Sequence, residues 1–141
     1  MSLCLTCNNT NDFRTLNSAS GRCVPLAGFY ESTITPAAPC PTCCATCLSN
    51  TQCTSCSAGC FLNLNLSCLT SCPDRSYKNT QNLRCSNCPL DCLTCDSSQN
   101  CLSCSPSDFR ELSSNRCMPM KGYFNTSKQI AAKCPAICAS C

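Results

Sequence analysis

The sequence contains no histidine and no tryptophan, and only 17 of its 141 residues are charged, 10 Lys and Arg against 7 Asp and Glu. Without histidine, Ser-His and Cys-His nucleophile pairs and histidine-ligated metal sites cannot form. The net charge is only +3, and the basic residues are scattered singly, with no run that could follow a phosphate backbone. The composition therefore argues against triad-type hydrolases and against nucleic-acid binding.

Long hydrophobic runs are also absent. No apolar stretch approaches the roughly 20 residues that a bilayer-spanning helix needs, so we predict no membrane span in this segment. Only 23 residues are Leu, Ile, Val or Phe (14, 3, 1 and 5), too few for a conventional hydrophobic core. The first residues show neither a charged nor an apolar leader, so either a signal has been removed or the sequence is a segment of something longer.

What the sequence has instead is cysteine. Its 22 cysteines make up about 16% of the chain (22 of 141), well above the level of about 8–10% that marks a disulfide scaffold. Disulfides lower the conformational entropy of the unfolded chain, and so stabilise a fold that buries too little apolar surface to be stable without them. Structural disulfides persist in oxidising compartments, and we therefore expect an extracellular or cell-surface protein of the secretory pathway.

The sequence also repeats itself. Asp12-Phe13-Arg14 returns as Asp108-Phe109-Arg110, and Phe61 lies midway between the two phenylalanines, at equal steps of 48 residues. The spacing C-x3-C-x2-C-x5-C-x2-C starts at Cys40 and again at Cys88, while a third copy begins at Cys134 and stops short. We therefore expect three repeats, residues 1–47, 48–95 and 96–141, of which the first begins and the last ends within a module.

These residues resemble the furin-like, growth-factor-receptor type of cysteine-rich repeat, which also occurs in tandem arrays on surface proteins of ciliates and other protists. The most specific element is Cys68-x3-Cys72-Pro73 with Tyr77, followed by Cys85-x2-Cys88-x3-Cys92. The resemblance implies a small disulfide-rich fold of tandem cysteine-rich modules, with little helix, stacked as an elongated rod and without enzymatic activity. Turn residues between apolar pairs predict short two-stranded β-ribbons that join Phe13–Leu16 to Arg22–Cys23, Phe61–Leu66 to Cys68, and Phe109–Leu112 to Arg116–Cys117.

Spacing alone leaves the disulfide connectivity open. In the family, two-bridge modules pair the first cysteine with the third and the second with the fourth, and one-bridge modules close a hairpin. Carried over, this rule implies nine bridges: Cys7–Cys23, Cys40–Cys47, Cys44–Cys53, Cys56–Cys68, Cys72–Cys85, Cys88–Cys95, Cys92–Cys101, Cys104–Cys117 and Cys134–Cys141. Cys43 and Cys60 have no counterpart in the other repeats, and we predict that they bond to each other.

Cys4 and Cys138 then remain. In the repeat register, Cys138 needs a partner six residues beyond Cys141, and Cys4 occupies that same role. The two would lie far apart in a rod of three repeats, which disfavours a bond within one chain. We predict an inter-unit disulfide, to a further copy of the chain or to an adjoining repeat of the same chain; the alternative is that both are free thiols or thiols separated from their partners by truncation.

Zinc binding, redox exchange and acid-base catalysis are the chemistries that the cysteines and acids could in principle support. Eight C-x2-C spacings are compatible with zinc, but Cys44-x2-Cys47 and Cys53-x2-Cys56 follow each other too closely for two zinc knuckles, and the sequence shows no thioredoxin-like frame for a redox pair. Asp91 and Asp96 flank two cysteines, but with few apolar residues to bury them we expect solvated turn residues. We therefore predict no enzyme, no metal and no cofactor.

Two further sets of residues are candidates for modification and packing. N-x-[ST] sequons predict N-linked glycans at Asn8, Asn65 and Asn125. Recurrent aromatics either pack on a disulfide or a neighbouring module or make lateral contacts in an assembly: Phe13, Phe29, Tyr30, Phe61, Phe109, Tyr123 and Phe124.

The sequence therefore favours a non-enzymatic extracellular structural protein, the repeat unit of a surface fibre, coat or stalk that assembles head to tail. The alternative is a spacer or dimerisation segment of a ligand-binding ectodomain. The first predicts open assembly through Cys4 and Cys138; the second predicts a defined monomer or dimer that binds a soluble partner saturably.

Overall fold

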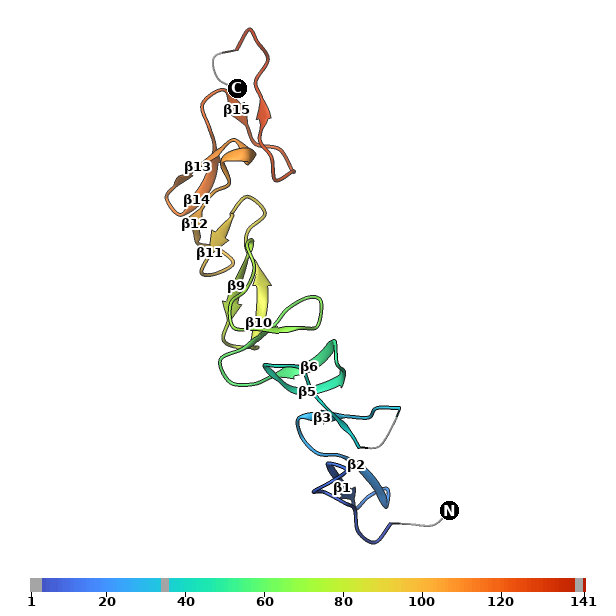
Figure 1. Cartoon of the computed structure of the whole chain (residues 1–141). Coiled ribbons are helices and arrows are strands. Elements are labelled where there is room, and N and C mark those ends of the chain that lie inside the picture. The colour runs from blue at the N-terminus through green and yellow to red at the C-terminus, as the bar shows by residue number, and fades with distance from the viewer. Residues whose placement is uncertain (1–3, 34–35, 139–140) are drawn as a thin grey trace. The chain divides into compact units, whose positions relative to one another are not determined.

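The computed structural model describes residues 4–33, 36–138 and 141 (Figure 1). Contacts within the chain separate two compact units, Met1–Ser71 and Cys72–Cys141, and each is described by itself. The boundary falls inside the second sequence repeat, residues 48–95. The three repeats and their stacking as a rod stay predictions.

The first unit consists of four antiparallel ribbons, each of two short strands. They are β1 (Arg14–Asn17) with β2 (Arg22–Pro25), β3 (Phe29–Tyr30) with β4 (Ala38–Pro39), β5 (Cys44–Ser49) with β6 (Gln52–Cys56), and β7 (Phe61–Leu62) with β8 (Cys68–Leu69). The longest of these ribbons, β5 with β6, holds the densest group of cysteines.

The second unit repeats this plan with four more antiparallel ribbons. They are β9 (Ser76–Asn79) with β10 (Arg84–Asn87), β11 (Thr94–Cys95) with β12 (Cys101–Ser103), β13 (Arg110–Ser113) with β14 (Arg116–Pro119), and β15 (Tyr123–Phe124) with β16 (Ala132–Lys133). The described residues contain one helix, the single 3-10 turn η1 (Pro106–Asp108).

Local chemistry explains why these segments reverse direction. Ser114 and Asn115 link β13 to β14 with φ of 50° and 62°, the left-handed pair of a two-residue hairpin turn, in which asparagine is favoured. Gly28 and Gly122 have φ of 84° and 83°, where a side chain would strain the backbone. Each glycine stands before the short strand β3 or β15 and turns the chain into it.

Cysteine forms most of the interior. Among the residues that the structure describes, 14 apolar residues are buried and ten of these are cysteines; the other four are Ala37, Phe61, Leu62 and Ala131. The protein is therefore a small disulfide-rich fold of short two-stranded ribbons with almost no helix, as predicted. The three predicted ribbons form, as β1–β2, β7–β8 and β13–β14. The strand predicted over Phe61–Leu66 is shorter than expected, because β7 ends at Leu62 and the chain turns before Cys68.

Candidate functional site

Ten disulfides join 20 of the 22 cysteines, and they are the nine pairs that the family resemblance implies together with Cys43–Cys60. The two remaining cysteines, Cys4 and Cys138, are unpaired and exposed. So many disulfides indicate an oxidising extracellular or secreted environment. No helix among the described residues is long and apolar enough to span a membrane.

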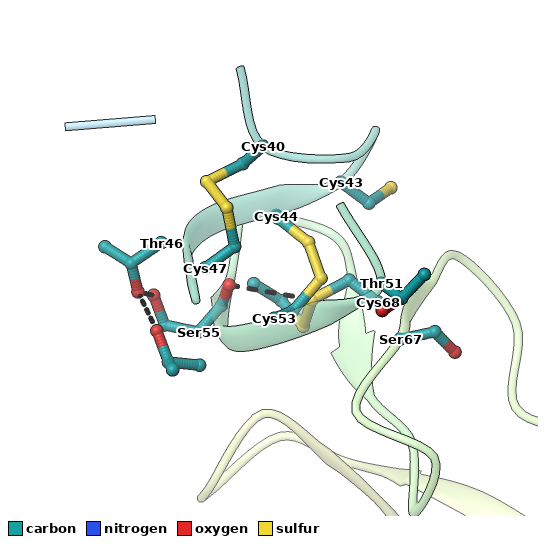
Figure 2. The surroundings of a disulfide bond; sticks show 12 residues. Cys40, Cys43, Cys44, Thr46, Cys47, Thr51, Cys53, Ser55, Ser67 and Cys68 are labelled. Atoms are coloured by element: carbon teal, nitrogen blue, oxygen red, sulfur yellow. Dashed lines mark hydrogen bonds between the residues drawn. A yellow bond between two sulfur atoms is a disulfide. The ribbon is translucent and has the colours of Figure 1, made fainter. Parts of the chain in front are cut away.

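The module around β5 and β6 shows how the cysteines are positioned (Figure 2). Antiparallel pairing sets Cys44 opposite Cys56 and Cys47 opposite Cys53. The Cys44–Cys53 disulfide joins the two strands, and the Cys40–Cys47 disulfide joins β5 to the segment that precedes it. The Sγ atoms of Cys44, Cys53 and Cys68 all lie within 4.8 Å of one another and are buried. Disulfide sulfurs are not the thiolates that zinc binds, so this group is the covalent core of the module.

Three backbone contacts fix this module. The Cys44 amide donates to the Pro41 carbonyl at 3.0 Å, and the Cys53 amide donates to the Leu66 carbonyl at 2.8 Å. The Cys68 Sγ lies 3.6 Å from the Ser55 carbonyl oxygen. Thr46 and Ser55, which face each other on β5 and β6, add a hydroxyl hydrogen bond (Figure 2).

The module in the second unit repeats each of these contacts. The Cys92 amide donates to the Pro89 carbonyl at 3.0 Å, and the Cys101 amide donates to the Asn115 carbonyl at 2.9 Å. The Cys117 Sγ lies 3.6 Å from the Ser103 carbonyl oxygen. Two complete modules in one chain therefore give an internal standard for the unpaired cysteines.

Cys4 and Cys138 each reproduce half of this standard. The Cys4 amide donates to the Gly21 carbonyl at 3.1 Å, as those of Cys53 and Cys101 do to their hairpins, and the Cys23 Sγ lies 3.8 Å from the Thr6 carbonyl oxygen. The Cys138 amide donates to the Pro135 carbonyl at 2.8 Å, as in the loops that hold Cys44 and Cys92. Cys4 therefore stands at the position of Cys53 and Cys101, and Cys138 at that of their disulfide partners Cys44 and Cys92. Neither Cys4 nor Cys138 is itself paired.

Arginine stands at the same position in the first and third repeats, as Arg14 and Arg110, but its hydrogen-bond partners differ. Arg14 donates two hydrogen bonds to the Glu31 carboxylate, at 2.6 and 2.8 Å, and this bonding lowers the pKa of Glu31 below its ordinary value. The counterpart Arg110 is buried and donates to Asn125 Oδ1 at 2.7 Å and to the carbonyls of Cys117, Lys128 and Gln129. A buried guanidinium held by four acceptors fixes the loop that follows β15.

Asp108 is the buried carboxylate of the second unit, with 2% of its surface exposed. Its Oδ2 accepts from Arg75 Nη2 at 2.8 Å, and both carboxylate oxygens accept from Gln129 Nε2. Arg75 also donates to the Cys92 carbonyl at 3.2 Å. This network joins η1 to the cysteine module around β11 and β12. The spacing of the cysteines does not indicate that such a network exists.

We expect Asp108→Asn to lower the unfolding free energy by about 1–3 kcal/mol, because it leaves Arg75 without its anionic partner in a mostly buried site. Urea unfolding of the oxidised protein measures the effect. The matched control is Asp12→Asn at the same repeat position, where the residue is only half-buried, and we expect a smaller loss there. Equal losses for the two variants would contradict a specific role for the buried network.

The candidate aromatics lie in two matching stacks. Phe13 stacks on Phe29 and Phe109 on Tyr123, each with ring centroids 4.5 Å apart. Phe13 and Phe109 adopt φ of 53° and 55°, unusual for a bulky residue, and the stack accompanies this conformation in both repeats. These four rings therefore pack within their own repeats, while Phe61 is buried, Tyr30 is half-buried and Phe124 is 38% exposed.

All three sequon asparagines are exposed. Asn8 Oδ1 accepts from the Thr10 hydroxyl at 3.2 Å and Asn65 Oδ1 from the Ser67 hydroxyl at 2.6 Å, whereas Asn125 Oδ1 accepts from Arg110. In each case the oxygen accepts the bond, and the amide nitrogen is the atom to which a glycan attaches. Of the two acids expected to be solvated turn residues, Asp96 is exposed and accepts from Asn100 in the β11–β12 turn, whereas Asp91 is half-buried.

No family model and no curated protein matches this sequence. The resemblance to furin-like repeats therefore rests on cysteine spacing and on the residues quoted for it. The candidate functional site is the pair of half-modules that contain the exposed thiols of Cys4 and Cys138.

Proposed function

We propose that the chain is a non-enzymatic extracellular structural protein made of furin-like repeats, the unit of a surface fibre, coat or stalk that assembles head to tail. The observation that carries this proposal is the pair of complementary half-modules at Cys4 and Cys138. All other cysteines are paired, so these two thiols are the sites available for a covalent link. Their partners are further copies of the chain or adjoining repeats of the same chain.

The two half-modules are complementary rather than identical, and this difference favours an open assembly. A link from Cys138 of one unit to Cys4 of the next joins two different surfaces, and a heterologous contact that does not close on itself generates an open filament. The disulfide-rich interior supports a structural role, because covalent bridges hold each module where few apolar residues are buried. Nothing in this proposal requires a cofactor or a metal.

N-linked glycans at Asn8, Asn65 and Asn125 are part of the proposal. The three asparagines are exposed, which leaves room for a bulky glycan. The 42 residues between Glu31 and Asp74 contain no charged side chain. A glycan at Asn65 would lie within that uncharged segment and keep it hydrated.

The test is to size the native protein in denaturant, first without a reducing agent and then after full reduction. The structural role predicts a series of multimers that becomes single chains once the inter-unit bonds are reduced. A defined monomer or dimer that binds a soluble partner saturably would instead support the spacer or dimerisation segment of an ectodomain.

A further inference from the structure

We propose that Asn125 carries an N-linked glycan whose first sugar, N-acetylglucosamine, packs into a cavity of the second unit and stabilises that unit. The cavity has a volume of about 220 Å³, and Asn125 is one of the residues that line it. The inference rests on the glycosylation included in the proposed function. It adds a binding site for the sugar and sets Asn125 apart from the other two sequon asparagines.

Asn125 stands where the first repeat has a glutamate. It directly follows β15, as Glu31 directly follows β3. Both side chains accept from the arginine at the matching position, Glu31 from Arg14 and Asn125 from Arg110. The two repeats therefore use this position alike, as an acceptor for arginine, and differ in whether the acceptor is a carboxylate or an amide.

An amide is the less expected acceptor for the arginine of the second unit. Arg110 is 3% exposed, whereas Arg14 pairs with a Glu31 side chain that is 62% exposed. A buried charge depends more strongly on an anionic partner than an exposed charge does. The four acceptors of Arg110 are nevertheless Asn125 Oδ1 and three backbone carbonyls. Asparagine at position 125 forgoes an ion pair, but it supplies the amide nitrogen to which a glycan can be attached.

Arg110 also fixes the orientation of the Asn125 side chain. Its Nη1 donates to Asn125 Oδ1 at 2.7 Å, so the oxygen is held by a buried group while Asn125 itself is exposed. Asn8 and Asn65, in contrast, accept from groups two or three residues further along their own turns. A glycan on a side chain that the tertiary structure already orients loses less conformational entropy when its first sugar contacts the protein.

The cavity beside Asn125 presents the two kinds of surface that a sugar ring needs. Cys101, Cys117 and Met118 give it apolar walls for the C–H faces of the ring, and Gln99 and Arg116 supply polar groups for its hydroxyl and acetamido oxygens. Ligand sites combine apolar walls with a few polar groups in this way, and those for drug-sized molecules have volumes of roughly 300–1,000 Å³. A cavity of about 220 Å³ therefore suits a single sugar rather than a longer chain of sugars.

Met118 is the apolar side chain that the sugar would cover. It lies on β14, is 44% exposed, and follows the buried Cys117. A sugar packed against Met118 removes apolar surface from water, and hydrogen bonds to Gln99 or Arg116 add to this gain. Opening of the β13–β14 ribbon would break these contacts, so the glycan is expected to slow the opening of that ribbon.

The experiment compares hydrogen exchange in three forms of the oxidised chain, secreted by eukaryotic cells that make high-mannose glycans. The first form keeps its glycans, the second has each glycan trimmed to its first sugar by an endoglycosidase, and the third is Ser127→Ala. Ser127 is exposed, and its substitution removes the sequon but keeps Asn125 and its bond to Arg110. We expect the β13–β14 amides to exchange about fivefold faster in Ser127→Ala, the effect of one hydrogen bond. The intact and trimmed forms should exchange at the same rate.

The controls are Thr10→Ala and Ser67→Ala, which remove the other two sequons and should leave the β13–β14 amides unchanged. Equal rates in all three forms, with Asn125 glycosylated, would overturn the inference, and so would faster exchange in the trimmed form than in the intact one. A bare Asn125 beside a glycosylated Asn8 or Asn65 would also overturn it. Absence of glycan from all three sites would contradict the glycosylation in the proposed function as well, whereas head-to-tail assembly is tested separately by the size of the multimers.

A second set of variants tests the cavity itself. Met118→Ala is made with and without Ser127→Ala. The matched control is Leu112→Ala, at an apolar residue of similar exposure on β13 that does not line the cavity. Groups that contact each other give non-additive effects. We expect Met118→Ala to lose most of its effect on β13–β14 exchange when the glycan is absent, and Leu112→Ala to have the same effect in both backgrounds. An equal effect of Met118→Ala with and without the glycan would contradict packing of the sugar in this cavity.

Discussion

Complete reduction of the ten disulfides is expected to unfold both units, with loss of the protected amides of all eight ribbons. The described residues bury only four apolar side chains other than cysteine, and Phe61 and Leu62 are the only large ones. Each bridge closes a loop of 7 to 17 residues and restricts the unfolded chain by roughly 2–3 kcal/mol. Without the bridges, the entropy of the unfolded chain exceeds what the remaining burial contributes.

Hydrogen exchange before and after reduction measures this effect. The control is oxidised protein in which only Cys4 and Cys138 have been alkylated, since these thiols are exposed and take no part in the bridges. We expect native protection in the control and none in the reduced chain. Ribbon amides that stay protected after all bridges are reduced would show that packing or hydrogen bonding, and not cross-linking, holds the modules.

Cys138→Ser is expected to end assembly while leaving the fold intact. Cys138 is exposed and has no disulfide partner in its own chain, so the substitution removes no packed or bonded group. The altered chain still carries Cys4, and the largest linked species open to it is a Cys4–Cys4 dimer. Non-reducing gel electrophoresis should therefore show loss of every species above the dimer.

Ile137→Ser, at the neighbouring exposed position, is the matched control, since it keeps both thiols. We expect it to retain the linked multimers of the unaltered chain. A Cys138→Ser chain that forms the same series of multimers as the unaltered chain would contradict a link through this residue.

The cysteine framework could be read from the sequence, because cysteine supplies both the cross-links and most of the buried surface. The ribbons that the sequence predicted are those with apolar pairs beside turn residues, such as Phe109 and Leu112 in front of Arg116. The β5–β6 ribbon was missed, because Cys44–Ser49 and Gln52–Cys56 combine cysteine mostly with small residues, and Leu48 is their only large apolar side chain. Its strands are held by disulfides and by hydroxyl contacts such as Thr46 with Ser55.

Other features depend on contacts that no local pattern reveals. Arg75 and Asp108 are 33 residues apart in sequence, and nothing in either segment distinguishes this buried pair from solvated charges. The stacks of Phe13 on Phe29 and of Phe109 on Tyr123 require phenylalanine at positive φ, which residue preferences alone disfavour. The half-modules, in contrast, were visible in the spacing, and the structure adds the backbone contacts that relate them to the complete modules.

The most direct test of the account is non-reducing peptide mapping of native material by mass spectrometry, with and without removal of glycans. The account predicts a peptide that joins Cys4 to Cys138 in linked chains, together with the ten bridges within each chain. Free thiols at both positions in the native protein, or a Cys4–Cys138 bond confined to chains of monomer mass, would contradict head-to-tail assembly.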